Sequence, residues 1–212
     1  YYPLDEMAGP TVADASRHRR DAVITGNATF YLAGPDQASF LEGTTVNRSL
    51  QLVGGSLRTR VPELNGDLTI SLWCFNGLGG ETREIQGWLT SLDHPQATSP
   101  SGLHLGLKST GPETGSLILQ LGDHQHTGSA TLHRWQWHHV ALVREGDAWQ
   151  LFVDGVLDAS GTGAAGLGPG DLLVIGGRSD GMDGWEGRLD EVAIFPRSLD
   201  AATIARLAAR QP

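Results

Sequence analysis

The chain has almost no cysteine and no long apolar run. Cys74 is its single cysteine, so no disulfide can form within the chain. No run approaches the roughly 20 apolar residues that a membrane-spanning helix needs, and we therefore expect no membrane insertion. A chain of 212 residues can nevertheless bury roughly 70% of the surface of its unfolded form. The length therefore fits one large domain, residues 1–212, that its core alone can stabilise.

Positive charge is also scarce. The 15 Lys and Arg residues stand against 24 Asp and Glu residues, which gives a formal net charge of −9. Because nucleic-acid binding needs a basic stripe or patch, we expect no nucleic-acid partner. An acidic protein of this kind suits calcium or neutral glycans as ligands.

The sequence does contain many turn residues and short alternating stretches. Its 29 glycines and 10 prolines are typical of a fold with many turns. Residues 135–158 predict three antiparallel strands, the first apolar on both faces as expected between two layers. Asp154-Gly155 predicts the second turn, because a type I′ hairpin needs the positive φ that glycine tolerates.

Four segments carry a resemblance to a known family. They are Tyr-Pro-Leu-Asp-Glu-Met-Ala-Gly at 2–9, Leu-Thr-Ile-Ser-Leu-Trp at 68–73, Trp-His-His-Val-Ala-Leu-Val at 137–143 followed by Leu-Phe-Val-Asp-Gly at 151–155, and residues 184–199 with the core Arg-Leu-Asp-Glu-Val-Ala-Ile-Phe. In this order they resemble laminin G-like domains of the concanavalin A-like lectin/glucanase superfamily, in the bacterial form that lacks a disulfide.

The resemblance implies an all-β antiparallel β-sandwich jelly roll, followed here by a short C-terminal helix that Asp200 can cap. It also implies a secreted or cell-surface location. Because the chain opens within the pattern of a family strand, we expect a domain excised from a larger secreted protein, with other domains of that protein as partners.

The expected function is non-catalytic recognition. Sandwich glycosidases of the laminarinase type carry carboxylates on alternate residues of one strand, and Glu186, Asp190 and Glu191 have the wrong spacing for this. No serine-hydrolase elbow or zincin motif is present either. We therefore predict a carbohydrate-binding module rather than an enzyme. The alternative is a protein-interaction, adhesion or spacer module that binds a cell-surface protein or no ligand, without sugar binding.

Three carboxylates are candidate ligands for a structural calcium ion: Glu6, Asp14 and Asp190. Asp190 shares an alternation face with Val192 and Ile194, so we expect it to point toward the interior. The first and last strands are neighbours in the family fold, which would bring Glu6 close to Asp190. The alternative is that Asp190 caps backbone amides in a turn and that Glu191 pairs with an arginine such as Arg197. His124 and His126 could hold zinc, but the sequence places no third ligand.

A sugar platform would need exposed aromatic rings. Trp88, His94, Trp135 and Trp185 lie on strands or loops that could rim one face, and they are our candidate ligand-binding residues. The alternative for each tryptophan is that it covers an edge of the core. Trp73, Trp137 and Trp149 stand in apolar alternation and are expected to be core residues.

Overall fold

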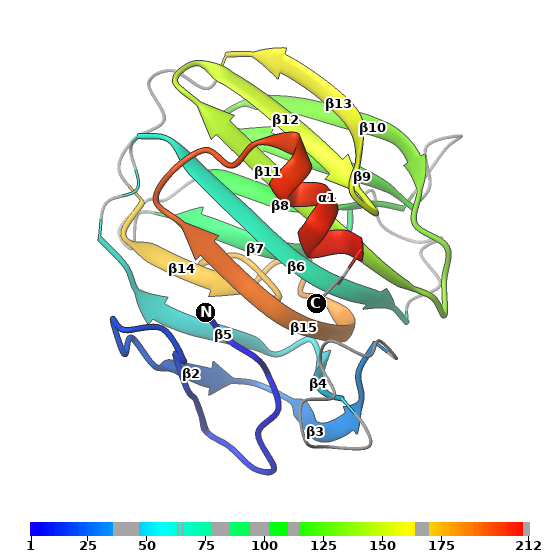
Figure 1. Cartoon of the computed structure of the whole chain (residues 1–212). Helices are drawn as coiled ribbons and strands as arrows, with labels where there is room; N and C mark the ends of the chain where they lie inside the picture. The colour runs from blue at the N-terminus through cyan, green and yellow to red at the C-terminus, as the bar shows by residue number, and fades with distance from the viewer. Residues whose placement is uncertain are drawn as a thin grey trace.

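The computed structural model describes residues 1–35, 47–62, 64, 66–77, 85–93, 102–109, 115–163 and 170–209. Two antiparallel sheets are stacked face to face, and one helix, α1 (Ala201–Ala209), lies against the outside of one of them (Figure 1). The predicted all-β sandwich with a short C-terminal helix is confirmed. Within these residues, no helix has the length and apolar character needed to cross a membrane.

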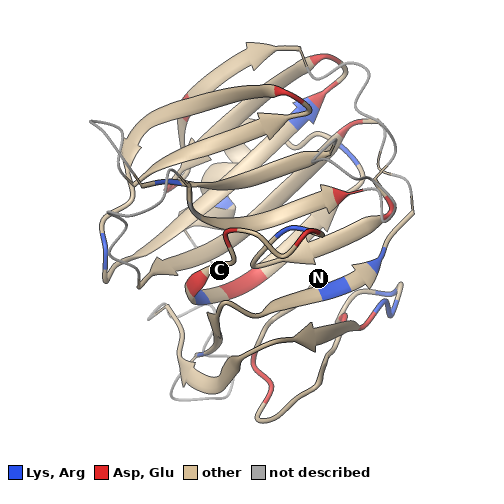
Figure 2. Ribbon diagram, turned by 180° about the vertical axis from the view of Figure 1, so that it is seen from behind, with Lys and Arg blue, Asp and Glu red and all other residues tan. Residues whose placement is uncertain are grey.

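The eight-stranded sheet has the order β1-β2-β5-β14-β7-β8-β9-β10. Its strands are β1 (Thr11–Val12), β2 (Ala22–Thr25), β5 (Ser56–Arg60), β14 (Leu172–Ile175), β7 (Ile85–Asp93), β8 (Leu103–Lys108), β9 (Ser116–Leu121) and β10 (His124–Thr131). Figure 2 shows Lys and Arg in blue and Asp and Glu in red from behind, with charged residues in loops, at strand ends and within some strands; Arg58 and Arg60 are both on β5.

The seven-stranded sheet has the order β13-β12-β11-β6-β15-β4-β3. Its strands are β13 (Val156–Thr162), β12 (Ala148–Val153), β11 (Trp137–Glu145), β6 (Leu68–Asn76), β15 (Glu186–Phe195), β4 (Arg48–Val53) and β3 (Ala28–Ala33). The three strands predicted for 135–158 are β11, β12 and β13, which pair in sequence order. Asp154 and Gly155 have φ of 50° and 81°, as the predicted type I′ turn requires.

Alternation along β6 separates the two faces of this sheet. Leu68, Ile70, Leu72 and Cys74 belong to the main core between the sheets. The residues of β6 that alternate with these four point to the outer face of the sheet. Part of this outer face packs against α1. The contact with α1 is made by buried residues of β11 and β12 and of the C-terminal segment: Ala141, Val143, Phe152, Leu199 and Ile204.

A bulge in β15 corrects the expectation for Asp190. Leu189 pairs with Cys74 and Asp190 with Trp73, but Ala193 already pairs with Ser71, so one extra residue lies between them. Glu191 has a φ of 53° at this point. Because an extra residue reverses the alternation, Asp190 lies on the outer face of the sheet, whereas Val192 remains in the main core.

The first and last segments of the chain are neighbours, as the resemblance implied. Tyr2 forms an isolated antiparallel bridge with Val192, with hydrogen bonds in both directions. Beyond this bridge the chain does not continue as a strand to Glu6, since Leu4 has a φ of 63° and turns the chain away. Tyr2 and Leu4 are both buried in the main core.

Candidate functional site

Four adjacent strands place one row of side chains across the outer face of the seven-stranded sheet. Arg188 of β15 pairs with Gln51 of β4 on one side and with Phe75 of β6 on the other. Phe75 in turn pairs with Trp137 of β11. Directly paired residues point to the same side of a sheet. The row therefore places four groups next to one another: the amide of Gln51, the guanidinium of Arg188, the phenyl ring of Phe75 and the indole of Trp137. Neighbouring strands lie about 4.8 Å apart, so the row is roughly 15 Å long.

Trp135 stands beside this row, in the loop that leads into β11. Its side chain is 60% exposed, the largest exposed fraction among the six tryptophans. Its φ is 63°, in the left-handed region that bulky residues rarely adopt. The backbone N–H of Trp135 donates to the carbonyl of Asn76 at 3.1 Å, which holds this conformation. A strained, exposed tryptophan held by the surrounding backbone is typical of a binding site rather than of a packing role.

Trp135 and three members of the row (Gln51, Arg188 and Phe75) line a hollow of about 240 Å³, which we name the Trp135 groove. Its lining residues come from β4, β6, β15 and two loops: Gln51, Leu52, Val53, Phe75, Gly77, Trp135, Glu186, Gly187 and Arg188. Gly77 leaves the space beside the Trp135 ring, because a Cβ there would lie 3.8 Å from that ring and 3.3 Å from the carbonyl oxygen of Glu186.

Aromatic and cationic groups order the floor of the groove. The Phe75 ring lies 6.1 Å from that of Trp135 and 5.5 Å from that of Trp137, with tilted planes in both pairs. The Arg188 guanidinium lies 5.0 Å from the Phe75 ring centre and donates to the Ala33 carbonyl at 2.9 Å. Arg134 lies 5.1 Å from the Trp135 ring centre. Such contacts hold the aromatic side chains in defined orientations.

The groove can bind a ligand that has both an apolar face and hydroxyl groups. Trp135 and Phe75 offer aromatic surface, while Arg188, Gln51 and Glu186 offer donors and acceptors at the same level. Sequence reasoning identified Trp135 but missed the other four. These residues come from three different strands, and only the pairing of β4, β15 and β6 brings them together.

The other aromatic candidates are not in this groove. Trp88 and Trp185 are 1% and 0% exposed, so neither ring presents a face to a sugar in this structure. Their backbones approach closely, because Trp88 pairs with Gly184 and its N–H donates to the carbonyl of Asp183. The adjacent glycines, Gly87 and Gly184, are the sequence signal for this close packing. His94 lies outside the described residues.

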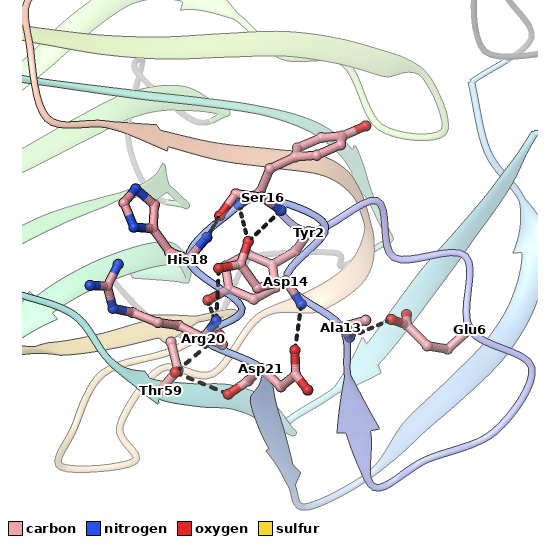
Figure 3. A network of polar contacts seen from close by, with 10 residues as sticks. Tyr2, Glu6, Ala13, Asp14, Ser16, His18, Arg20, Asp21 and Thr59 are labelled. Atoms are coloured by element: carbon pink, nitrogen blue, oxygen red, sulfur yellow. Dashed lines mark hydrogen bonds and ion pairs between the residues drawn. The ribbon is translucent and has the colours of Figure 1, made fainter.

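Asp14 organises the loop that follows β1 (Figure 3). Its carboxylate accepts hydrogen bonds from the amino group of Tyr1 at 2.8 Å and from the backbone N–H groups of Ser16 and Arg20, both at 2.9 Å. Burial raises the pKa of Asp14, but these donors outweigh it and hold the pKa well below its usual range. The carboxylate therefore caps a loop.

The other two calcium candidates have separate partners. Glu6 Oε1 accepts from the backbone N–H of Ala13 at 2.8 Å, and Asp190 Oδ2 accepts from Nδ2 of Asn47 at 2.7 Å. Among the described residues, no group of three or more His, Cys, Asp or Glu side chains could hold a metal ion, which includes the histidines considered for zinc. The predicted ligands thus do not converge into a calcium site here. Calcium binding stays a prediction, to be tested by melting the protein with EDTA and then with added calcium.

Comparison with known proteins agrees with this architecture. Residues 43–205 match a laminin G-type family model described as the concanavalin A-like lectin/glucanases superfamily. A search of curated protein sequences gives no significant match.

Among solved structures, the chain is similar to domain 4 of AbnA, an extracellular arabinanase from Geobacillus stearothermophilus, solved in complex with arabinotriose. The TM-score is 0.63 with 20% identity, over 88% of this chain and 87% of that one. It is also similar to the receptor-binding domain of botulinum neurotoxin C/D mosaic serotype, with a TM-score of 0.69 and 13% identity over 98% of this chain and 50% of that one.

A third similar structure is the sialidase of Trypanosoma rangeli, with a TM-score of 0.68 and 17% identity. The match covers 99% of this chain but only 32% of the sialidase. Binding domains and domains of enzymes thus share this fold, and at these identities the likeness concerns the fold alone. The family match covers most of the chain and agrees with the two-sheet architecture, so the chain belongs to the concanavalin A-like lectin/glucanase superfamily.

Proposed function

We propose that this chain is a non-catalytic carbohydrate-binding module and that the Trp135 groove is its sugar site. The observation that carries the proposal is the exposed, strained Trp135 beside Phe75 and Arg188. A pyranose or furanose ring has one face of C–H groups, which packs on an aromatic ring, and an edge of hydroxyls that needs hydrogen-bond partners. The groove supplies both kinds of surface within one hollow.

The composition of the groove favours binding over hydrolysis. Most glycoside hydrolases use two carboxyl groups, either about 5–5.5 Å or about 6.5–9.5 Å apart. The described lining of the groove contains one carboxylate, that of Glu186. The similarity to an arabinanase domain solved with arabinotriose makes an oligosaccharide of that kind a reasonable first probe. A module of this type would form part of a secreted or cell-surface protein that contains further domains.

Calorimetric titration of the purified chain tests the proposal. The probes are arabinotriose and a panel of linear oligosaccharides from xylans, glucans and galactans. We expect at least one to bind with 1:1 stoichiometry, and Trp135→Ala to weaken that binding about tenfold or more, which corresponds to roughly 1.4 kcal/mol. Val156→Ala is the control, because Val156 is exposed and apolar but lies outside the groove.

Two results would overturn the proposal. One is the absence of binding to every oligosaccharide of the panel. The other is sugar binding that Trp135→Ala leaves unchanged, since the site would then lie elsewhere. Either result would favour the alternative function, in which the exposed Trp135 and Val53 contact a protein partner. Tryptophan is equally suited to the centre of a protein interface.

A further inference from the structure

A second and larger hollow lies on the same outer face, nearer to α1. Its volume is about 660 Å³, within the range of about 300–1,000 Å³ that is typical of small-molecule sites. We name it the α1 cleft. Its walls come from α1, the end of β15, the first residues of the chain, the loop after Asp14, the segment after β5 and Leu173 of β14. It shares no lining residue with the Trp135 groove.

The floor of the α1 cleft is aromatic and well ordered. The rings of Trp73 and His139 lie 5.3 Å apart, and Nε2 of His139 is 2.9 Å from Oγ of Ser71. All three residues are buried by their neighbours, so their positions are fixed by packing. Phe195 and Leu207 continue the apolar lining, and both are only half-buried. The cleft therefore offers preformed apolar surface that the chain itself does not fully cover.

The rim of the cleft carries the opposite charge to the rest of the protein. Arg17, Arg20 and Arg206 line it together with His18, although the chain as a whole has a net charge of −9. Figure 3 shows His18 and Arg20 extending to the same side of the loop that Asp14 holds.

The acidic groups nearby are engaged. The two carboxylate oxygens of Asp14 accept the backbone hydrogen bonds of Ser16 and Arg20. Glu191 accepts a hydrogen bond from the hydroxyl of Tyr1. Arginine guanidinium groups match the geometry of carboxylate, sulfate and phosphate oxygens. The rim thus favours one anionic group at the mouth of the cleft.

From these observations we propose that the α1 cleft binds a small amphiphilic anion. The aromatic or aliphatic body of the ligand lies on Trp73, Phe195 and Leu207, and its single carboxylate, sulfate or phosphate group faces the arginines of the rim. This site is separate from the sugar site proposed above and does not depend on it.

Two fluorescent probes that differ by one charged group test this assignment. 1-Anilinonaphthalene-8-sulfonate has the aromatic body and the anion, whereas N-phenyl-1-naphthylamine has the same rings without the sulfonate. We expect the sulfonate to bind with 1:1 saturation and at least about tenfold more tightly than the neutral probe. Competition by decanoate, decyl phosphate and 1-decanol then shows which anionic group is preferred, and the alcohol should compete least.

Three variants locate the probe. Ala193→Phe adds a ring to a residue that lines the cleft and should abolish saturable binding. Arg206→Ala should weaken sulfonate binding severalfold and leave the neutral probe unaffected. Arg197→Ala is the matched control, since Arg197 is exposed near α1 but does not line the cleft.

Near-ultraviolet circular dichroism checks that Ala193→Phe folds. Arg206 is an exposed helix residue, so its variant keeps the test valid if Ala193→Phe does not fold.

Equal affinity for the charged and neutral probes would overturn the charge assignment. Saturable binding that persists in both Ala193→Phe and Arg206→Ala would overturn the location. A lack of saturable binding by the wild-type chain would overturn the proposal as a whole.

Discussion

At the scale of single residues, the tryptophans differ mainly in how far each is covered. Trp73, Trp88, Trp149 and Trp185 are all 6% exposed or less, whereas Trp135 is 60% exposed. Immediate neighbours separate them only in part, because Trp135 stands between Arg134 and Gln136 but the buried Trp185 also has a polar neighbour, Glu186. The positive φ of Trp135 lifts its ring off the sheet, and that φ is set by the loop before β11.

Acrylamide quenching of tryptophan fluorescence measures this difference directly. We predict that Trp135→Phe removes most of the quenchable, red-shifted emission, because four of the other five rings are at most 6% exposed and Trp137 is half-buried. Trp149→Phe, which alters a buried ring of the main core, should leave the quenchable fraction almost unchanged. Similar quenching in the wild type and in Trp135→Phe would contradict the exposure of this ring.

His104 gives a second prediction, through the pH dependence of stability. Burial lowers its pKa to about 4, although Asp93, whose Oδ1 lies 3.5 Å from Nε2, opposes the shift. An unfolded histidine has a pKa of about 6.5, so between about pH 6.5 and pH 4 the unfolded chain binds a proton that the folded chain does not. The free energy of unfolding should therefore fall as the pH is lowered through this window.

Urea unfolding at pH 7.5, 6 and 5 checks the sign. The loss of stability between pH 7.5 and 5 should be smaller in His104→Gln than in the wild type, because the variant has no group to protonate at this position. His124→Gln is the control, since it removes a histidine that is exposed in β10. If both variants lose stability as the wild type does, His104 is not held neutral by burial.

At the scale of elements, one aspartate ties the β12–β13 hairpin to β11. The N–H of His133 donates to Nε2 of His138 at 3.1 Å, so the proton of that ring is on Nδ1, which donates to Oδ2 of Asp154 at 2.8 Å. Asp154 Oδ1 accepts from the N–H of His139 at 2.9 Å. Asp154 thus closes the hairpin and also orients the histidine of the neighbouring strand.

Asp154→Asn separates these two roles, because asparagine also tolerates the positive φ of the turn but has only one acceptor oxygen. One of the two hydrogen bonds must be lost, and we expect a cost of about 1 kcal/mol, near the lower end for charged hydrogen bonds because Asp154 is half exposed. Burial raises the pKa of Asp154 while both histidine donors lower it, and the net direction is downward. The aspartate therefore contributes stability above about pH 4 that is lost as the pH falls further.

Chemical denaturation of the two proteins at pH 7 and at pH 3 measures both effects. The difference in unfolding free energy should be present at pH 7 and should shrink at pH 3. A difference of the same size at both values would mean that the charge of Asp154 has no part in it.

At the scale of the whole molecule, both hollows reach the outer face of the seven-stranded sheet, and the α1 cleft also extends to Leu173 of β14 and to the segment after β5. Passing along β6, Thr69 lies next to the start of α1, Ser71 and Trp73 form the floor of the α1 cleft, and Phe75 belongs to the Trp135 groove. Asp190 pairs with Trp73 and is buried between the two hollows.

Because the two hollows share no lining residue, we predict that their ligands bind independently. Trp135→Ala should weaken binding of the oligosaccharide and leave binding of the naphthalene sulfonate unchanged, whereas Ala193→Phe should have the reverse effect. Titration of each ligand in the presence of saturating amounts of the other should give unchanged affinities. A change of severalfold in either titration would mean that the two hollows are coupled through the sheet.

The sequence by itself determined the three strands of residues 135–158, the Asp154-Gly155 hairpin, the C-terminal helix and the family, because these follow from short-range alternation, turn chemistry and local motifs. It also named Trp135 as one of four candidate ligand-binding residues, together with Trp88, His94 and Trp185. Only the tertiary structure decided what surrounds Trp135, since Gln51, Phe75 and Arg188 are far apart in the chain and meet through strand pairing. The bulge at Glu191 likewise moved Asp190 to the outer face, because a single extra residue reverses an alternation that sequence reasoning must assume to be unbroken.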